Sequence, residues 1–215
     1  MPIRKKDYQR WPTSRKTLFL RGIERVNEFC EANRIQPPPI QQIGKEKWFV
    51  SACAYYRPET EATKKYTSPG INICLELCGR PCSEPTTRNW SWPGSTVDRG
   101  PYGVLCHELG HHCDWHTGAK KWSYGSEYCE EVKQESGEPG ITSYAQENPA
   151  EWFAESFRLF VTNPGLLQTL RPLTYSILTR RWKPLLPLDW RVVLGSNVPE
   201  RVVKSLLNKG AKQCT

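Results

Sequence analysis

A histidine-glutamate pair and a second histidine lie close together near the middle of the sequence. His107, Glu108 and His111 spell His-Glu-x-x-His within PYGVLCHELGHHCDWH, a segment that we expect to be helical from Pro101 to about Trp115. Because residues four apart on a helix return to within about 40° of each other, both imidazoles project from one face and can bind one Zn²⁺. Glu108 lies about 100° from His107, where its carboxylate can take a proton from water beside the metal.

A zinc site also needs a third protein ligand, and a downstream segment offers two carboxylates for it. In ITSYAQENPAEWFAESFRLF, Glu151 and Glu155 share one face of a predicted helix, opposite its phenylalanines. One carboxylate can ligate the metal, while the other accepts a hydrogen bond from a ligand histidine or pairs with Arg158. The alternative is that both glutamates lie on a solvated helix face.

Other polar residues of the first motif have less specific interpretations. Asp114 returns to the face of the two histidines, where it can accept a hydrogen bond from an imidazole, or it is an exposed residue at the helix end. His116 is out of register for a third ligand, so we expect His112 and His116 to be surface or packing residues. The apolar back of the predicted helix consists of Leu105, Cys106, Leu109 and Cys113.

The downstream segment resembles a known family. Residues 142 to 160, TSYAQENPAEWFAESFRLF, are similar to the active-site segment of the anthrax lethal factor type of gluzincin, a group that includes the Pro-Pro endopeptidases. The resemblance rests on Tyr144 seven residues before Glu151, with Phe-Ala-Glu at 153 to 155, and on the HELGH sequence. It covers roughly residues 101 to 162.

The resemblance implies a zinc-dependent endopeptidase acting on a protein or peptide. By resemblance, one Zn²⁺ is bound by His107, His111 and Glu151, and Glu108 is the general base. Tyr144 then donates a hydrogen bond to the oxyanion that develops on the substrate. Asp114 and Glu155 are expected to support the ligands from outside.

The C-terminal part carries a second, shorter resemblance. The segment VTNPGLLQTLRPLTYSILTRRWKPLL and the residues shortly after it are similar to zincin-like proteins encoded by bacteriophages, which suggests a phage or prophage origin. The doubled His112, the cysteines that flank the first helix and an acidic insertion before Tyr144 depart from the lethal factor pattern. We expect these departures to affect the choice of substrate.

Alternating residues upstream of the first motif predict a strand. INICLEL at 71 to 77 has the period of a half-buried strand, and residues 47 to 56 favour a second one. By analogy with zincins, we expect the strand at 71 to 77 to be the sheet edge that pairs with an extended substrate. Asn72, Cys74 and Glu76 would then line its outer face.

Three cysteines at positions 74, 78 and 82 recur every four residues. Structural zinc sites favour paired Cys-x-x-Cys sequences, so we expect semi-buried free thiols, with a second metal site as the alternative.

These elements predict a single α+β domain over residues 1 to 215 with a small mixed sheet, and the resemblance implies a zincin-like fold. We expect an N-terminal helix at 13 to 36, a catalytic core at 45 to 162 and a helical C-terminal portion at 163 to 215. Asn148 and Pro149 start the glutamate helix, Pro172 interrupts the next helix, and a short last helix begins near Asn197.

Composition excludes several classes of protein. With 38% hydrophobic residues, nine Trp and nine Tyr, the chain is too apolar and aromatic to be disordered. No stretch approaches the ~20 apolar residues of a membrane span, and no secretory signal is recognised, so we expect a cytoplasmic protein with reduced cysteines. Virion association is the alternative for a phage protein.

The net charge of +8 is concentrated near both ends and allows weak contact with nucleic acid. One alternative function is therefore a DNA-associated protease. The other is a structural or host-binding protein that has the zincin fold and weak or no turnover.

Overall fold

The computed structural model describes residues 9, 13–42, 54–58, 69–73, 101–116, 123, 135, 141–142 and 144–185. The α-helices in this part of the chain are α2 (Thr13–Asn33), α3 (Pro101–His116), α5 (Pro149–Thr162), α6 (Pro164–Leu170) and α7 (Pro172–Arg181). The remaining elements are the 3₁₀ helix η4 (Tyr144–Gln146) and the strands β1 (Ile40–Gln42), β2 (Ala54–Arg57) and β3 (Gly70–Ile73). The predicted α+β class with a small mixed sheet is confirmed.

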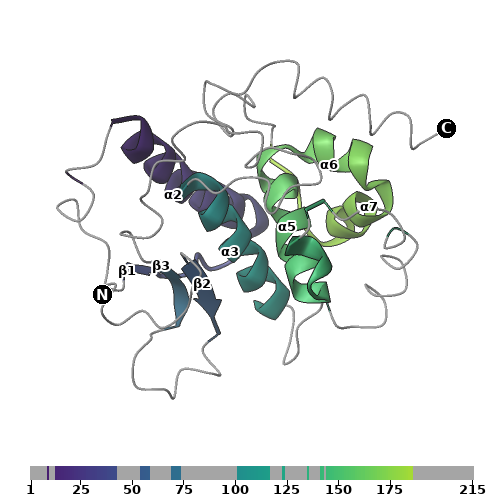
Figure 1. The fold of residues 1–215 in the computed structure, drawn as a ribbon, viewed down its shortest axis with the longest axis horizontal. Coiled ribbons are helices and arrows are strands. Elements are labelled where there is room, and N and C mark those ends of the chain that lie inside the picture. Colours follow the sequence, from purple (N-terminus) through teal and green to yellow (C-terminus); the bar gives the residue numbers. More distant parts are fainter. Residues whose placement is uncertain are drawn as a thin grey trace.

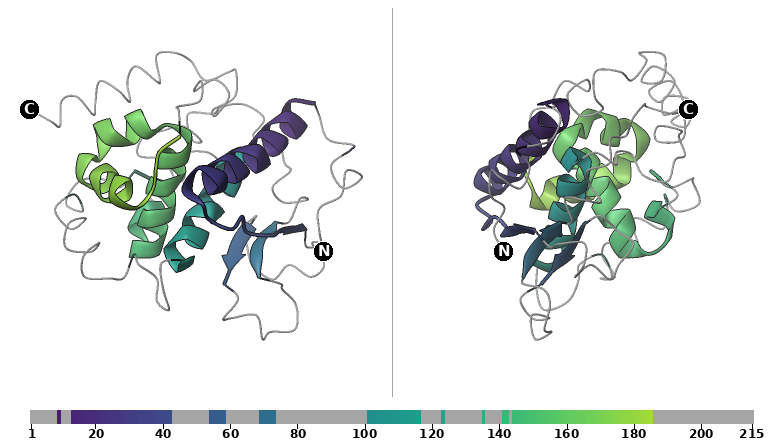
Figure 2. Two further views of the ribbon diagram at one scale, coloured as in Figure 1. Left: turned by 180° about the vertical axis from the view of Figure 1, so that it is seen from behind. Right: turned by 60° about the vertical axis from the view of Figure 1, so that its left-hand side comes forward.

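Helix α3 lies in the middle of the described structure. Helix α2 and the sheet pack on one side of it, and α5 packs on the other, followed by α6 and α7 (Figure 1). The views from behind and from the side show the same order (Figure 2). The two helices predicted to carry the site, α3 and α5, are therefore direct neighbours.

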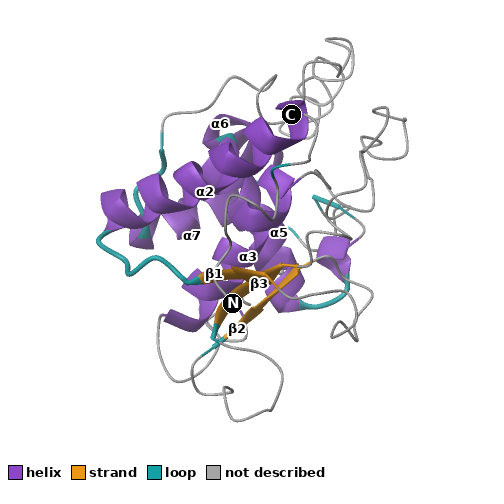
Figure 3. Ribbon diagram, turned by 90° about the vertical axis from the view of Figure 1, so that its left-hand side faces the viewer, coloured by secondary structure: helices purple, strands orange, loops and turns teal. Residues whose placement is uncertain are grey.

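The sheet has the order β1-β3-β2, with β3 in the centre (Figure 3). Strand β1 is parallel to β3, and β2 is antiparallel to it. The expectation that the strand starting near residue 71 is the sheet edge is therefore wrong, because β3 is paired on both sides. Among the described strands β2 is an edge on the side near α3, and β1 has no counterpart in the sequence-based prediction.

The direction of the β2 backbone groups follows from the pairing. The Ile71 N–H donates to the Pro39 carbonyl oxygen at 2.8 Å, so this N–H points toward β1. Tyr56 is the β2 partner of Ile71, and the pair is therefore a non-hydrogen-bonded one. The N–H and C=O of Tyr56 consequently point away from β3.

The core is formed by the apolar faces of α2, α3 and α5. Phe157 packs edge-on against Phe29 of α2, with ring centroids 5.1 Å apart, and against Trp182 at 5.3 Å. It also stacks with Phe153 at 5.4 Å. The predicted burial of the phenylalanine face of α5 is confirmed, so the opposite face of this helix is left for the two glutamates.

Local sequence explains where α5 begins and where the next helix is broken. The Asn148 side-chain oxygen accepts from the N–H groups of Ala150 and Glu151, and Pro149 occupies the first helical position. Pro172 divides the predicted C-terminal helix into α6 and α7, as expected.

Several predictions fall outside the described residues. These are the start of the strand at 47 to 56, the end of the strand at 71 to 77, the cysteines at 74, 78 and 82, Glu76, and the last helix near Asn197. Every helix in the described part of the chain is too short or too polar to pass through a lipid bilayer.

Candidate metal centre

A glycine lets the two helices of the site approach closely. A β-carbon at Gly110 of α3 would lie 2.8 Å from the Cα of Ala154 and 3.1 Å from the Cβ of Phe157, both in α5. These distances are shorter than ordinary contact between carbon atoms, so any side chain at position 110 would push the helices apart. Gly110 lies between the two histidines of α3 and so brings them to the glutamate face of α5.

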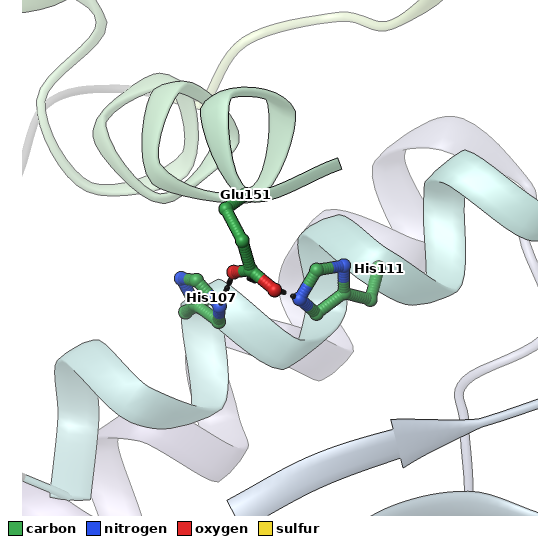
Figure 4. A group of neighbouring side chains, drawn as sticks. All are labelled: His107, His111 and Glu151. Carbon is green, nitrogen blue, oxygen red and sulfur yellow. Dashed lines mark ion pairs between the residues drawn. The ribbon is translucent and has the colours of Figure 1, made fainter. Parts of the chain in front are cut away.

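Two histidines and a glutamate converge across this helix contact (Figure 4). The Glu151 Oε2 atom lies 3.1 Å from Nε2 of His107 and 3.4 Å from Nε2 of His111. One ligand atom from each of the three residues lies within 4.8 Å of the other two. Donor atoms around a tetrahedral zinc ion with bonds of 2.0–2.1 Å are about 3.3 Å apart, which is close to the two observed contacts.

The protonation of His107 makes its inner nitrogen available to a cation. Nδ1 of His107 lies 2.7 Å from the Glu155 carboxylate, which can only accept, so Nδ1 carries the hydrogen. In the neutral ring Nε2 then presents a lone pair toward Glu151. The Glu151 Oε2 atom is buried without a hydrogen-bond partner. Electron-pair donors that face one another in this way need a proton or a metal ion between them, and the distances among the three donor atoms fit a metal ion.

The electrostatics of the site also favour positive charge. Burial lowers the pKa of His107, but its close contacts with Glu151 and Glu155 and the negative charges of Glu155 and Glu108 outweigh this effect and raise the pKa to about 10. Burial raises the pKa of Glu151, and contacts with both histidines more than reverse this and hold it well below its usual value. The carboxylates around His107 therefore stabilise a cation at this position.

Glu108 lies beside the three ligand atoms and is 5% exposed. Burial is the main cause that raises its pKa, and the Tyr56 backbone N–H, which donates to the carboxylate, opposes this rise. The Oε2 atom of Glu108 is buried and has no hydrogen-bond partner. One oxygen of the carboxylate is thus held by the edge of β2, and the other is free to take a proton.

Tyr144 lies in η4 next to the same histidine. Its ring centroid is 5.8 Å from that of His107, and the two ring planes are inclined by 35°. Burial, followed by the charge of Glu151, raises the pKa of the Tyr144 phenol. The phenol therefore keeps its hydrogen near neutral pH and can donate it in a hydrogen bond.

Glu155 supports His107 from outside the ligand set. Its Oε1 atom contacts Nδ1 of His107, and its Oε2 atom accepts from Arg158 at 2.7 Å and from Thr142 at 2.8 Å. The sequence predicted a hydrogen bond to a ligand histidine or a pair with Arg158, and the structure contains both. Glu155 is 1% exposed, so the alternative of a solvated carboxylate is wrong for this residue.

Asp114 is fully buried, so its alternative as an exposed helix-end residue is also wrong. Its carboxylate accepts from the backbone N–H and the hydroxyl of Ser123, each at 2.7 Å. A contact with an imidazole stays a prediction for Asp114. Glu155 occupies that supporting position at His107.

His112 is a packing residue, as expected. Its Nε2 lies 3.0 Å from the Gln36 carbonyl oxygen and its Nδ1 lies 3.2 Å from the Tyr56 hydroxyl. The ring therefore joins α3 to β2, whose backbone contacts Glu108. The side chain of His116 lies outside the described residues.

The predicted substrate face of the strand near residue 71 needs correction. Asn72 is 1% exposed, and its side-chain amide donates to the Gly70 carbonyl oxygen at 3.1 Å. Its expected position on an outer face is wrong, because β3 is a central strand and covered. Cys74 and Glu76 lie outside the described residues.

Sequence reasoning missed two contributors to the site. Thr142 binds Glu155 through its hydroxyl, and the Tyr56 backbone N–H binds Glu108. A threonine that precedes a turn is a recognisable signal in a sequence, because its hydroxyl commonly caps the turn. A backbone N–H at a sheet edge leaves no comparable signal in side-chain type.

Comparisons of the chain with protein-family models, with curated proteins and with solved structures found no match. The functional assignment therefore rests on the geometry of the site. The buried His107 and the partly buried His111 and Glu151 come from two packed helices and can hold a metal ion.

Proposed function

We propose that this protein is a zinc-dependent endopeptidase of the gluzincin type. The observation that carries the proposal is the convergence of the His107, His111 and Glu151 ligand atoms beside the free oxygen of Glu108. The similarity of residues 142 to 160 to the lethal factor family supports the same assignment.

The donor set favours zinc in a catalytic role. Structural zinc sites have four protein ligands, whereas catalytic sites have three and leave a position open. Two imidazoles and one carboxylate are a known catalytic set for zinc. When bound, zinc supplies a Lewis acid that polarises a substrate carbonyl. The residues present therefore fit both the metal and a hydrolytic reaction.

The reaction requires a base and an oxyanion donor, and two residues are placed for these tasks. The free Oε2 of Glu108 takes a proton from the attacking water and returns it to the departing amine. The raised pKa of this carboxyl makes it a stronger base than an exposed glutamate. The Tyr144 phenol keeps its hydrogen and donates to the oxygen on which negative charge develops.

The substrate is proposed to be a protein or peptide in extended form. Strand β2 is an edge among the described strands and contacts Glu108 through the Tyr56 N–H, so a substrate chain paired along this strand would lie beside the proposed base. An extended chain can pair with such an edge through its backbone. The proposed pairing edge is therefore β2, instead of the strand that the sequence favoured. The similarity of the C-terminal part to phage-encoded proteins extends the proposal to a phage or prophage origin.

Native mass spectrometry and a peptide-cleavage assay test the proposal together. The full chain is stripped with a chelator, supplied with zinc, and compared with Glu151→Ala and Glu108→Gln. We expect one zinc in the wild type, weakened or absent binding in Glu151→Ala, and retained zinc in Glu108→Gln. We expect the wild type to cleave a mixed peptide library and Glu108→Gln to lose that cleavage.

The outcomes separate the alternatives. Zinc binding without any cleavage beyond that of Glu108→Gln would refute the peptidase and favour a structural or host-binding protein. No zinc in the wild type would refute the metal site. Zinc loss in Glu108→Gln would show that Glu108 is a ligand and not the base.

A further inference from the structure

Three carboxylates anchor the chain that runs from α3 to α5 and contains η4. Asp114 accepts two hydrogen bonds from Ser123, and Glu135 accepts three from the first residues of α7. The third anchor is Glu155, which accepts from Thr142. This anchor differs in function from the other two, because Glu155 also contacts a histidine of the metal site.

Thr142 is 1% exposed, and its hydroxyl makes two contacts. It donates its single hydrogen to Oε2 of Glu155 at 2.8 Å, and it accepts from the Ala145 N–H at 3.1 Å. Ala145 is the residue after Tyr144 in η4, so the second contact fixes the backbone of the turn at Tyr144. A threonine hydroxyl that accepts from a following N–H is a common way to hold a turn.

The two contacts reach two parts of the site. Through Glu155 the hydroxyl is connected to Nδ1 of His107, whose other nitrogen faces Glu151. Through the turn it is connected to Tyr144, whose ring lies beside the same His107 ring. The buried Thr142 hydroxyl therefore contacts both the carboxylate that holds His107 and the turn that holds the Tyr144 phenol.

We propose that Thr142 is a positioning residue, whose hydroxyl holds Tyr144 beside the metal site and at the same time holds Glu155 against His107. The part that concerns Tyr144 rests on the proposed function, since it needs a reaction in which the phenol takes part. Thr142 acts through these two residues and is not itself a catalytic residue.

Thr142→Val is the most direct perturbation because it keeps the shape of the side chain and removes both hydrogen bonds. The Ala145 N–H then loses its acceptor and the turn at Tyr144 loosens. A misplacement of a catalytic group by about 1 Å can cost about a hundredfold in rate. Loss of a residue that supports a metal ligand typically lowers metal affinity by about ten- to a hundredfold. Because Glu155 keeps its bond to Arg158, we expect zinc affinity to fall by no more than about tenfold.

Hydrogen exchange of the Ala145 amide is a test that needs no catalytic activity. It is measured by mass spectrometry with fragmentation on the full chain, with and without zinc. We expect protection in the wild type and in Thr142→Ser, and exchange faster by about tenfold in Thr142→Val. An unprotected Ala145 amide in the wild type would overturn the proposal even if Thr142→Val failed to fold.

A double-mutant cycle tests whether Thr142 acts through Tyr144. We expect kcat for peptide cleavage to fall by about ten- to a hundredfold in Thr142→Val and to recover largely in Thr142→Ser. In a Tyr144→Phe background the same change should cost much less, because the phenol that it positions is gone. Independent, multiplying effects would overturn the connection to Tyr144.

Thr162→Val is a matched control. Thr162 is also 1% exposed, and its hydroxyl donates to the Arg158 carbonyl oxygen within α5. We expect this variant to leave the exchange of Ala145 unchanged. Failure of zinc binding or of peptide cleavage would refute the proposed function, whereas exchange at Ala145 would still decide whether Thr142 holds the turn.

Discussion

Replacing Gly110 by Ala should damage the metal centre without changing any ligand. The added β-carbon would lie 2.8 Å from the Ala154 Cα and 3.3 Å from the Ala154 carbonyl oxygen. Carbon atoms rest about 3.5–4.0 Å apart, so α3 and α5 would have to separate by about 1 Å at this point. Because both neighbours are backbone atoms of α5, no side chain can rotate away to relieve the contact.

The separation has two measurable consequences. Overpacking of this kind costs about 1–3 kcal/mol, and each kcal/mol corresponds to about 2–4 °C in the melting temperature of a chain of this size. Glu151 moves with α5, whereas metal bonds tolerate about 0.2 Å. Zinc binding must bring α3 and α5 back together, and we take the cost as the same overpacking energy of about 1–3 kcal/mol. Zinc affinity then falls by about ten- to a hundredfold, since 1.4 kcal/mol is a factor of ten.

Thermal unfolding of the metal-free protein and competition with a chromogenic zinc chelator measure the two effects. Gly165→Ala is the matched control, because the only atom near a β-carbon there is the Asn163 side-chain oxygen at 3.9 Å. Gly165 is exposed at the start of α6, so this variant should be as stable as the wild type or slightly more so. A Gly110→Ala protein that binds zinc and melts like the wild type would refute the close-packing argument.

Three further predictions concern the surroundings of the site. Glu155→Gln should weaken zinc binding by roughly tenfold or more, because His107 loses a charged acceptor, and chelator competition measures it. Asn148→Ala should lower the free energy of unfolding by about 1 kcal/mol, measured with urea, because the start of α5 loses its cap. Burial raises the pKa of Cys30 to about 12 and that of Cys113 well above its usual value, so iodoacetamide should label both at pH 8 only after denaturation.

The parts of the site that could be predicted from sequence are those determined by local spacing. His107 and His111 share a face because they are four residues apart on one helix, and Glu151 and Glu155 do so for the same reason. Capping by Asn148 is also a local property. The structure adds that the two helix faces meet. Residue spacing within each helix could not predict this contact or the distances between the ligand atoms across it.

The parts that were missed depend on contacts between distant segments. Strand β1 is only three residues long, and its pairing with β3 joins positions about 30 residues apart, so neither its existence nor the sheet order follows from alternation. An alternating strand such as the one at 71 to 77 can be central or at an edge. The hydroxyl of Ser123 and the carboxylate of Asp114 likewise show their pairing only in three dimensions.

The charges around the site predict how the protein responds to removal of its metal. The carboxyl groups of Glu108, Glu151 and Glu155 surround His107, whose pKa is raised to about 10, and the Arg158 guanidinium contacts Glu155. Near neutral pH the metal-free His107 is therefore an imidazolium, so three ionised carboxyl groups face two positive charges. A divalent cation that replaces the His107 proton neutralises the one negative charge that remains. By mass action, zinc that binds only the folded protein should stabilise the fold by about 4 kcal/mol at a free concentration a thousand times its Kd.

The same charge balance predicts that Glu108→Gln stabilises the metal-free protein. The change removes one of the crowded carboxylates and keeps the size of the side chain, so the metal-free variant should melt at a higher temperature than the metal-free wild type. The zinc-loaded variant should gain less from the metal, because less negative charge is left to neutralise. Differential scanning calorimetry of both proteins, with and without zinc, gives the four melting temperatures. A metal-free Glu108→Gln protein that melts no higher than the wild type would show that packing, and not charge repulsion, limits the stability of the empty site.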